Sequence, residues 1–293
     1  VVAVDLRGCG DSDKLAFRYQ YTTDILVEDV ASLIRALERE SAYVACCGLS
    51  GQVGWSLAYK YPDMVKKLVL FHAPHPYVIR QHFHSSLMHY IKGWYYLFVR
   101  LPFLPELAAS LNDGALIDSL LKPLIREKAV TKDEIEAYKF NFTTYSEWSG
   151  ALQHMRQISL APVWEDEAPP RVLSTPTLLI MGDPDALTPI DLAYRSAEYV
   201  ERITIKPLSG PPRLVHQSKP TQVNRVVLEF LREMPWKPLT PATSSLMGRV
   251  MGAGMFAVNK TTDVWQMSQN VGILGMAKAS LDIAEAKLGF DQL

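Results

Sequence analysis

The chain has 293 residues, of which 48% are hydrophobic and 21% are charged, so it can bury a full core and is larger than the usual single sandwich or bundle. Its net charge of −1 gives no long-range field for polyanions, which disfavours nucleic acid and anionic membranes as partners. No uninterrupted apolar run of about 18 residues occurs, so we expect no transmembrane segment.

Residues 1–75 read as strands that alternate with helices. In chain order the predicted elements are a strand over 1–6, a helix over 22–39, a strand over 42–47, a helix over 52–61 and a strand over 65–70. Thr22 or Thr23 is a suitable N-cap for the first helix. Neighbouring strand residues point to opposite faces, so Cys46 and Cys47 are expected to be free thiols, which favours an intracellular reducing compartment.

A tight turn joins the strand over 42–47 to the helix that follows it. Strand, sharp turn and helix is the arrangement of a nucleophile elbow. Close packing of the strand against the helix leaves space only for small residues on either side of the tip, and Cys46, Ser50 and Gly51 are small. The tip itself is Gly48, which has no side chain.

Residues 76–168 are mainly helical and aromatic, and we expect them to form a lid over the sheet. The chain then returns to the core with a strand over 174–182, a helix over 190–199, a strand over 202–207 and a helix over 222–232. A Pro-rich linker leads to a last predicted helix, over 262–288, with an apolar stripe. The expected divisions are core residues 1–75, lid residues 76–168, core residues 169–234 and a linker with a helical extension over 235–293.

Three separated segments resemble the epoxide-hydrolase branch of the α/β-hydrolase family. The first is Asp5-Leu6-Arg7-Gly8-Cys9-Gly10-Asp11-Ser12, which matches the family's D-x-R-G-x-G-x-S segment. The second runs from Trp55 to the loop Pro74-His75-Pro76, and the third, over 174–185, resembles the strand whose end carries the triad acid. The resemblance covers most of residues 1–235. It implies an α/β fold with a mostly parallel sheet, helices on both faces and an inserted helical lid.

The resemblance also implies which positions would carry the chemistry. The family elbow reads G-x-D-x-G-G, in which the Asp attacks an epoxide and a His-activated water hydrolyses the resulting ester. In this register Gly48 stands at the nucleophile and Arg213 at the base, although a guanidinium cannot accept a proton. The triad acid Asp185 and one epoxide-polarising lid tyrosine, Tyr95, are retained, while Met155 replaces the second tyrosine. We therefore expect a catalytically inactive hydrolase relative that serves as a structural or binding subunit of a larger assembly.

Two other uses of these residues stay open. Ser50 and His216 could form a displaced serine triad with Asp185, which would make the protein an active epoxide or ester hydrolase. Asp185 could instead be a structural carboxylate that pairs with Arg213. We expect no cofactor and no metal, because the histidines at the start of the lid lack a matching set of carboxylates or cysteines.

The expected partners follow from what the resemblance implies about the sheet. The family's first strands are not among these residues, and one of them lies between the strands over 1–6 and 42–47 in the family. An open sheet edge recruits other strands, so we expect protein partners at this edge or through the helix over 262–288. That helix could instead dock on its own domain. The lid cavity could hold an apolar small molecule.

Overall fold

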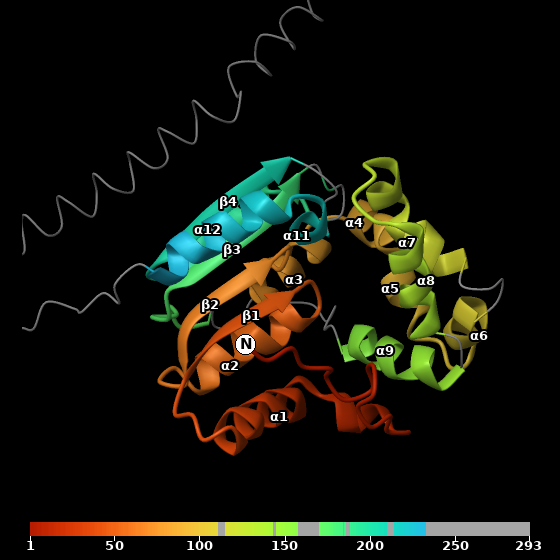
Figure 1. Ribbon diagram of the computed structural model, residues 1–293, viewed down its shortest axis with the longest axis horizontal. Coiled ribbons are helices and arrows are strands. Elements are labelled where there is room, and N and C mark those ends of the chain that lie inside the picture. The colour runs from red at the N-terminus through yellow and green to blue at the C-terminus, as the bar shows by residue number, and fades with distance from the viewer. Residues whose placement is uncertain are drawn as a thin grey trace, which may run out of the picture. The chain divides into compact units, whose positions relative to one another are not determined.

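Parallel strands form a sheet in the order β1-β2-β3-β4 in a computed structural model of the chain (Figure 1). The strands are β1 (Ala42–Cys47), β2 (Val65–Phe71), β3 (Thr177–Asp183) and β4 (Ile203–Ser209). Leu68 of β2 pairs with Val44 of β1 on one side and with Thr177 of β3 on the other. The structure describes residues 1–110, 115–142, 145–157, 170–183, 185, 188–209 and 214–232.

Helices cover both faces of this sheet, which confirms the predicted α/β class (Figure 1). On one face α12 (Pro220–Arg232) and the short α11 (Val215–Ser218) pack apolar side chains against Val69, Leu178 and Ile180. On the other face α2 (Ser50–Lys60) packs against β1 and β2. Beside it, α1 (Thr23–Ala36) contacts α2, and α3 (Pro76–His84) contacts α10 (Asp191–Ser196). The central strands are apolar on both sides because both faces are covered.

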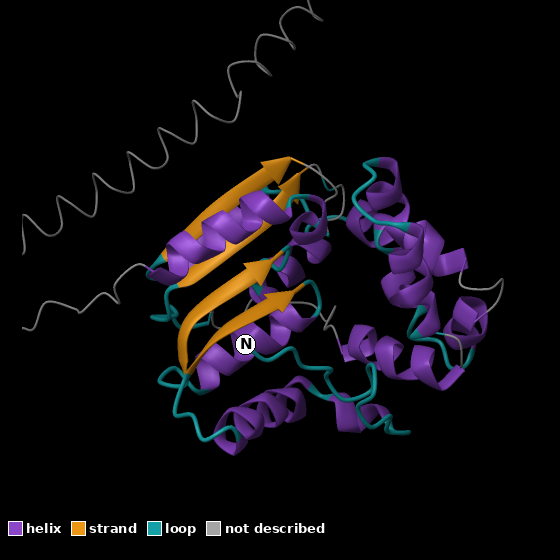
Figure 2. Cartoon of the chain, in the orientation of Figure 1, coloured by secondary structure: helices purple, strands orange, loops and turns teal. Residues whose placement is uncertain are grey.

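A helical insertion follows α3 and has a hydrophobic core of its own (Figure 2). Its helices are α4 (Leu87–Lys92), α5 (Trp94–Phe98), α6 (Leu104–Ser110), α7 (Ala115–Arg126), α8 (Lys132–Phe140) and α9 (Tyr145–Gln157). The buried core side chains include Leu121, Leu124 and Trp148. A buried ion pair joins α9 to α6, with Arg156 Nη1 2.6 Å from Glu106 Oε1. The insertion is therefore held together by its apolar core and by a buried ion pair between α6 and α9.

Lys67 fixes the C-terminal helix to the sheet from a buried position in β2. Only 4% of this residue is exposed, and its Nζ donates to the carbonyl oxygens of Phe230 at 2.6 Å and Leu231 at 3.3 Å. Both carbonyls belong to the last turn of α12, where a cation is favoured by the helix dipole. The lysine therefore satisfies carbonyl groups at the end of α12.

The prediction of a strand over residues 1–6 was wrong. This segment runs as irregular chain, and its apolar side chains are exposed, with Val2 at 58% and Val4 at 47%. A strand needs a hydrogen-bonding neighbour, and in the described part of the chain β1 pairs only with β2. Among the described residues, β1 therefore lies at one end of the sheet.

The other predicted elements form, with shifted ends. The helix predicted to end at residue 39 ends at Ala36, and the helix predicted from 52 already begins at Ser50. The helix predicted over 190–199 is divided into α10 and a 3-10 turn, η2 (Ala197–Tyr199). A further 3-10 turn, η1 (Arg18–Tyr21), precedes α1. The predicted helix over 262–288 lies outside the described residues, and none of the helices within them is long and apolar enough to cross a bilayer.

Candidate active site

The turn between β1 and α2 has the backbone of a nucleophile elbow. Gly48 follows the last residue of β1 with a φ of +55°, in the left-handed region that side chains disfavour. Its N–H donates to the carbonyl of Phe71 at 2.9 Å, and its own carbonyl accepts from the N–H of Gly51 at 3.0 Å. The tip of the elbow is thus tied both to β2 and to the first turn of α2.

The glycines around the elbow differ in how closely their surroundings approach them. A Cβ placed on Gly51 would lie 2.2 Å from Cβ of Ala73, and one on Gly54 would lie 2.8 Å from Sγ of Cys46. A Cβ on Gly48 would meet no atom of the described residues within 4 Å. Gly51 and Gly54 are therefore required by close packing of α2, and Gly51 is one of the predicted small positions. At Gly48 the described residues leave room for a side chain.

Asp185 contacts a histidine that we did not predict as its partner. Its Oδ2 lies 3.0 Å from Nε2 of His72, and both side chains are buried, at 6% and 3% exposed. The other carboxylate oxygen accepts the backbone N–H of Thr188 at 3.2 Å, and the Thr188 hydroxyl lies 2.5 Å from the same His72 nitrogen. Asp185, His72 and Thr188 therefore form one polar cluster at the carboxyl ends of β2 and β3.

The cluster constrains the protonation of His72. A proton on Nε2 can be donated to the Asp185 carboxylate, and this leaves Nδ1 with a lone pair. Nδ1 is buried and has no hydrogen-bond partner among the described residues. A hydrogen bond from this ring to the Asp185 carboxylate requires the proton on Nε2, whichever state Nδ1 has. The imidazole that donates to Asp185 is thus that of His72 and not that of His216, which the alternative triad would need.

The members of the alternative serine triad do not converge. Ser50 Oγ bonds to the backbone of Cys47, 3.0 Å from both its nitrogen and its oxygen, so the hydroxyl is held within its own turn. His216 lies on the opposite side of Cys47, with Nδ1 3.8 Å from Sγ and its ring 5.5 Å from that of Phe71. Among the described residues, neither Ser50 nor Asp185 hydrogen-bonds to His216. A serine triad would require these side chains to move.

The contact between Cys47 and His216 brings together two uncharged groups. Burial raises the pKa of the Cys47 thiol to about 11 and lowers the pKa of the His216 imidazole. Desolvation by burial is the cause of the raised Cys47 pKa, and a thiol with so high a pKa is a poor nucleophile at neutral pH. Cys46 points to the other face of β1, against Gly54, and burial raises its pKa to about 11 as well. The two adjacent thiols therefore lie on opposite faces, as predicted, and both are protonated.

Tyr95 and Met155, two further predicted positions, lie on helices of the insertion. Tyr95 is half-buried on α5, with its ring 4.4 Å from that of Tyr96, in a cluster around Phe83. Met155 is half-buried on α9 and packs on the lid core. Arg213 lies outside the described residues, so its pairing with Asp185 stays a prediction. The roles assigned to these residues likewise stay predictions.

The histidines near the start of the lid serve local structure. His75 accepts the N–H of Tyr77 at the beginning of α3 and lies 2.9 Å from the hydroxyl of Tyr59. His82 stacks on His89 with ring centroids 3.8 Å apart. Within the described ranges, no three His, Cys, Asp or Glu side chains gather as metal ligands.

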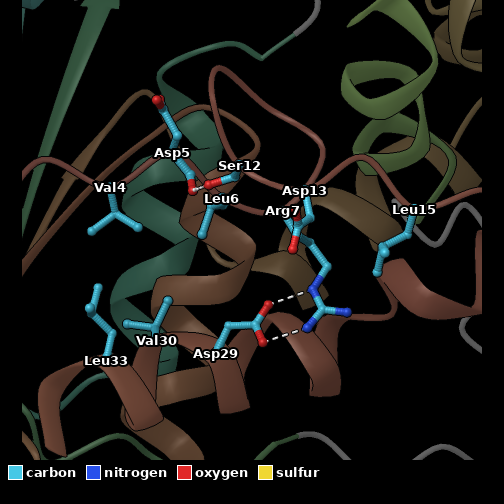
Figure 3. A pocket seen from close by; sticks show the side chains of 10 residues that line it. All are labelled: Val4, Asp5, Leu6, Arg7, Ser12, Asp13, Leu15, Asp29, Val30 and Leu33. Carbon is cyan, nitrogen blue, oxygen red and sulfur yellow. Dashed lines mark hydrogen bonds and ion pairs between the residues drawn. The ribbon is translucent and has the colours of Figure 1, made fainter. Parts of the chain in front are cut away.

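A cavity of about 280 Å³ lies away from the elbow, between the N-terminal segment and α1 (Figure 3). Arg7 spans it and binds Asp29 through two bonds of 2.5 Å. Asp5 and Ser12 also line it, whereas Gly48 and Asp185 do not. This cavity is separate from the polar cluster described above.

Comparison with known proteins assigns the family. The sequence profile of the alpha/beta hydrolase fold matches residues 1–207. The chain belongs to the α/β-hydrolase family. Within the family it falls in the epoxide-hydrolase-like branch, as predicted. It is 31% identical over 242 residues to human epoxide hydrolase 4 and 29% identical over 237 residues to epoxide hydrolase 1 of Caenorhabditis elegans.

A solved structure supports the same assignment. The epoxide hydrolase of Bacillus megaterium, crystallised with an inhibitor, superposes with a TM-score of 0.66 at 26% identity, covering 78% of this chain and 82% of that one. The sequence matches cover 80% and 79% of this α/β-hydrolase chain, but only 65% of the human relative and 58% of the nematode relative. The chain thus spans about three fifths of these relatives.

His72 and Thr188 were the residues that sequence reasoning missed as partners of Asp185. His72 comes directly after β2, and Asp185 follows β3 two residues beyond its end. Carboxyl ends of adjacent parallel strands meet at one edge of a sheet, so the order of the strands could have predicted the contact. The contact was not expected because His72 is the first of several histidines in residues 72–89 and was considered only as a metal ligand.

Proposed function

We propose that this protein is a catalytically inactive member of the epoxide-hydrolase-like branch and acts as a structural or binding subunit. The observation that carries the proposal is the tip of the elbow. There the backbone has the left-handed φ of a nucleophile position and the described residues leave room for a side chain, but the residue is Gly48. Without a carboxylate, hydroxyl or thiol at this point, no ester intermediate can form on the elbow.

Two further features support the proposal. The family register puts Arg213 at the base, and a guanidinium cannot activate water at neutral pH. The nearest described thiol, Cys47, has its pKa raised by burial to about 11 and is not a ready substitute nucleophile. Triad members act as a unit, and the loss of one lowers the rate by roughly four to six powers of ten. Gly48 and Arg213 together would therefore abolish the family reaction.

The test is a hydrolysis assay with the full chain on a panel of epoxides and aryl esters. Wild type is expected to match an Asp185→Asn variant at the background rate. Turnover by wild type above that variant would contradict the proposal. If Ser50→Ala or His216→Gln also removed such turnover, the displaced serine triad would be the correct alternative.

A gain-of-function pair tests the register directly. Gly48→Asp restores a carboxylate at the tip, and Arg213→His restores an imidazole at the base position. The double variant is expected to form an ester with an epoxide and to hydrolyse it, whereas Gly48→Asp alone is expected at most to form the ester. Mass spectrometry of the intact protein would detect the ester as an added substrate mass. A double variant that forms no adduct would argue against this register.

The subunit role rests on the end of the sheet at β1. In the described part of the chain β1 pairs only with β2, and its Tyr43 is 54% exposed; a free strand edge pairs readily with another strand. We include in this proposal the lid division over residues 76–168, an apolar ligand in the lid cavity, and partner contacts through residues 262–288. Light scattering of the protein isolated from its source measures the assembly. A stable monomer would contradict the subunit role.

A further inference from the structure

A run of exposed apolar side chains follows the first helices of the insertion. Nine large apolar residues between 44% and 75% exposed follow one another along α4, α5, the turn after α5, and α6. They are Leu87, Met88, Ile91, Trp94, Leu97, Leu101, Phe103, Leu104 and Leu107, which we call the apolar lid surface. Single exposed apolar residues are ordinary, but a cluster of this kind marks an interaction site.

The helices that carry these exposed residues also bury other apolar side chains inside the insertion. On α5, Tyr95 and Tyr96 pack around Phe83, while Trp94 and Leu97 of the same helix are 61% and 48% exposed. On α6, Ala109 belongs to the lid core, while the neighbouring Leu107 is 53% exposed. A helix that is apolar on both sides is normally buried on both sides. The apolar lid surface is therefore suited to contact a second apolar environment.

Phe103 has a backbone conformation that bulky residues rarely adopt. Its φ is +63°, and its side chain is 73% exposed. A bulky residue in the left-handed region is strained, and an exposed phenyl ring gains nothing from the hydrophobic effect. Both costs are repaid only when the ring enters an apolar phase. The turn that presents Phe103 is therefore built to project an aromatic side chain outward.

Within residues 64–105 the charged side chains all have one sign. No Asp or Glu occurs in residues 64–105, and the next acidic residue, Glu106, is 3% exposed and paired with Arg156. Lys92 and Arg100 are the charged residues that lie exposed among the apolar side chains. The net charge of the whole chain, −1, hides this local excess of positive charge. A local basic rim around apolar side chains complements an anionic surface.

We propose that the apolar lid surface docks on a lipid bilayer, with Phe103, Trp94 and neighbouring leucines in the interface and Lys92 and Arg100 at anionic headgroups. This geometry is that of a protein lying on a membrane, and it needs no spanning helix. A second copy fits less well, because a two-fold contact would bring the exposed basic residues Lys92 and Arg100 of the two copies towards each other. The proposal stands apart from catalysis, since it does not depend on the elbow.

The test is flotation of the full chain with phosphatidylcholine vesicles and with vesicles that also contain phosphatidylserine. Wild type is expected to bind the anionic vesicles more strongly. Lys92→Gln should reduce that binding about fivefold, since one basic residue near an anionic surface contributes a factor of this order. It should leave binding to neutral vesicles unchanged. Leu107→Gln should reduce binding to both kinds of vesicle.

A matched variant controls for loss of any exposed leucine. Leu228, on α12, is 48% exposed against 53% for Leu107, and it lies outside the apolar lid surface. Leu228→Gln should bind vesicles as wild type does. Equal losses in Leu228→Gln and Leu107→Gln would overturn the proposal, because the contact would then not be at the lid. Wild type that fails to float with either vesicle would overturn it as well.

Phe103→Gly separates docking from a structural role. Glycine accepts the positive φ, so this variant should raise the urea midpoint of unfolding while it weakens vesicle binding. A structural Phe103 would instead lower the midpoint, and that result would contradict the proposal. Self-association that Leu107→Gln abolishes, without vesicle binding by wild type, would assign the surface to a second copy and overturn docking on lipid.

Discussion

Alanine substitutions at the two elbow glycines should both destabilise the protein, but for different physical reasons. At Gly48 the backbone is left-handed and no atom of the described chain would meet a Cβ, so we expect conformational strain alone to oppose a methyl group. At Gly51 the backbone is helical, but a Cβ would lie 2.2 Å from Cβ of Ala73. The comparison therefore separates strain from steric overlap within one turn.

The magnitudes follow from the two geometries. For Gly48→Ala, the left-handed conformation costs about 1–2 kcal/mol, with no steric term. For Gly51→Ala, non-bonded carbons approach to about 3.5 Å, so the chain must move apart by more than about 1 Å. Overpacking of this kind costs about 1–3 kcal/mol, and we expect the upper end because backbone has to shift. Better helix propensity returns about 1 kcal/mol, which leaves a net loss of about 2 kcal/mol.

Urea unfolding of the single variants and of their combinations with Ala73→Gly measures both effects. Ala73→Gly removes the atom that Gly51→Ala would meet, so this pair should show a coupling free energy of at least about 1 kcal/mol. The same change should not rescue Gly48→Ala. A Gly48→Ala variant as stable as wild type would refute the positive φ at the tip. Additive effects of Gly51→Ala and Ala73→Gly would refute the close approach of α2.

Three further predictions concern buried charge and polarity. Burial lowers the pKa of His75 to about 3, below its unfolded value of about 6.5, so the unfolded chain binds the extra proton. Stability should therefore fall as pH decreases from about 6.5 towards 3, by at most about 1.4 kcal/mol per pH unit, and urea unfolding of His75→Phe should show a smaller pH slope than wild type. Glu106→Gln leaves the Arg156 charge buried without its partner and should lower the free energy of unfolding by about 3–5 kcal/mol. Adding Arg156→Met should recover part of this loss. A loss below about 1 kcal/mol in Glu106→Gln would contradict a desolvated ion pair. Lys67→Met removes the donor to the last turn of α12 and should lower the free energy of unfolding by about 1–3 kcal/mol. Unchanged rates of amide hydrogen exchange in this turn would argue against a role of Lys67 in fixing α12 to the sheet.

Much of the fold could be predicted because its signals are local. The apolar runs of β2 and β3 and the helical spacing of α1 and α12 depend only on neighbouring residues, and each produced the predicted element. The segment over 1–6 has the same apolar character, but a strand exists only where another strand supplies hydrogen bonds. Sequence pattern predicts a preference for extended chain, and pairing decides whether that preference becomes a strand.

The candidate site was predictable in its backbone and less so in its side-chain partners. Gly48 could be placed at the tip because small residues at fixed spacing identify the elbow, and its φ of +55° confirms the turn. The contact between Asp185 and His72 joins residues 113 positions apart, and no local pattern links them. It depends on the adjacency of β2 and β3, which the order of strands along the chain only suggests.

The preserved elbow is not by itself an argument for activity. Gly51 and Gly54 are required because α2 packs closely on β1 and on the chain after β2, and that packing would persist whether or not a nucleophile stood at the tip of the elbow. At the tip the same backbone imposes the opposite preference, because a left-handed residue is least strained as glycine. A functional elbow carries this strain to place its nucleophile, and loss of catalysis would remove the reason to carry it. On the proposal that Gly48 stands at a lost nucleophile position, glycine is the residue that would stabilise the fold once catalysis no longer mattered. On this reasoning Gly48→Asp should lower the stability of the protein.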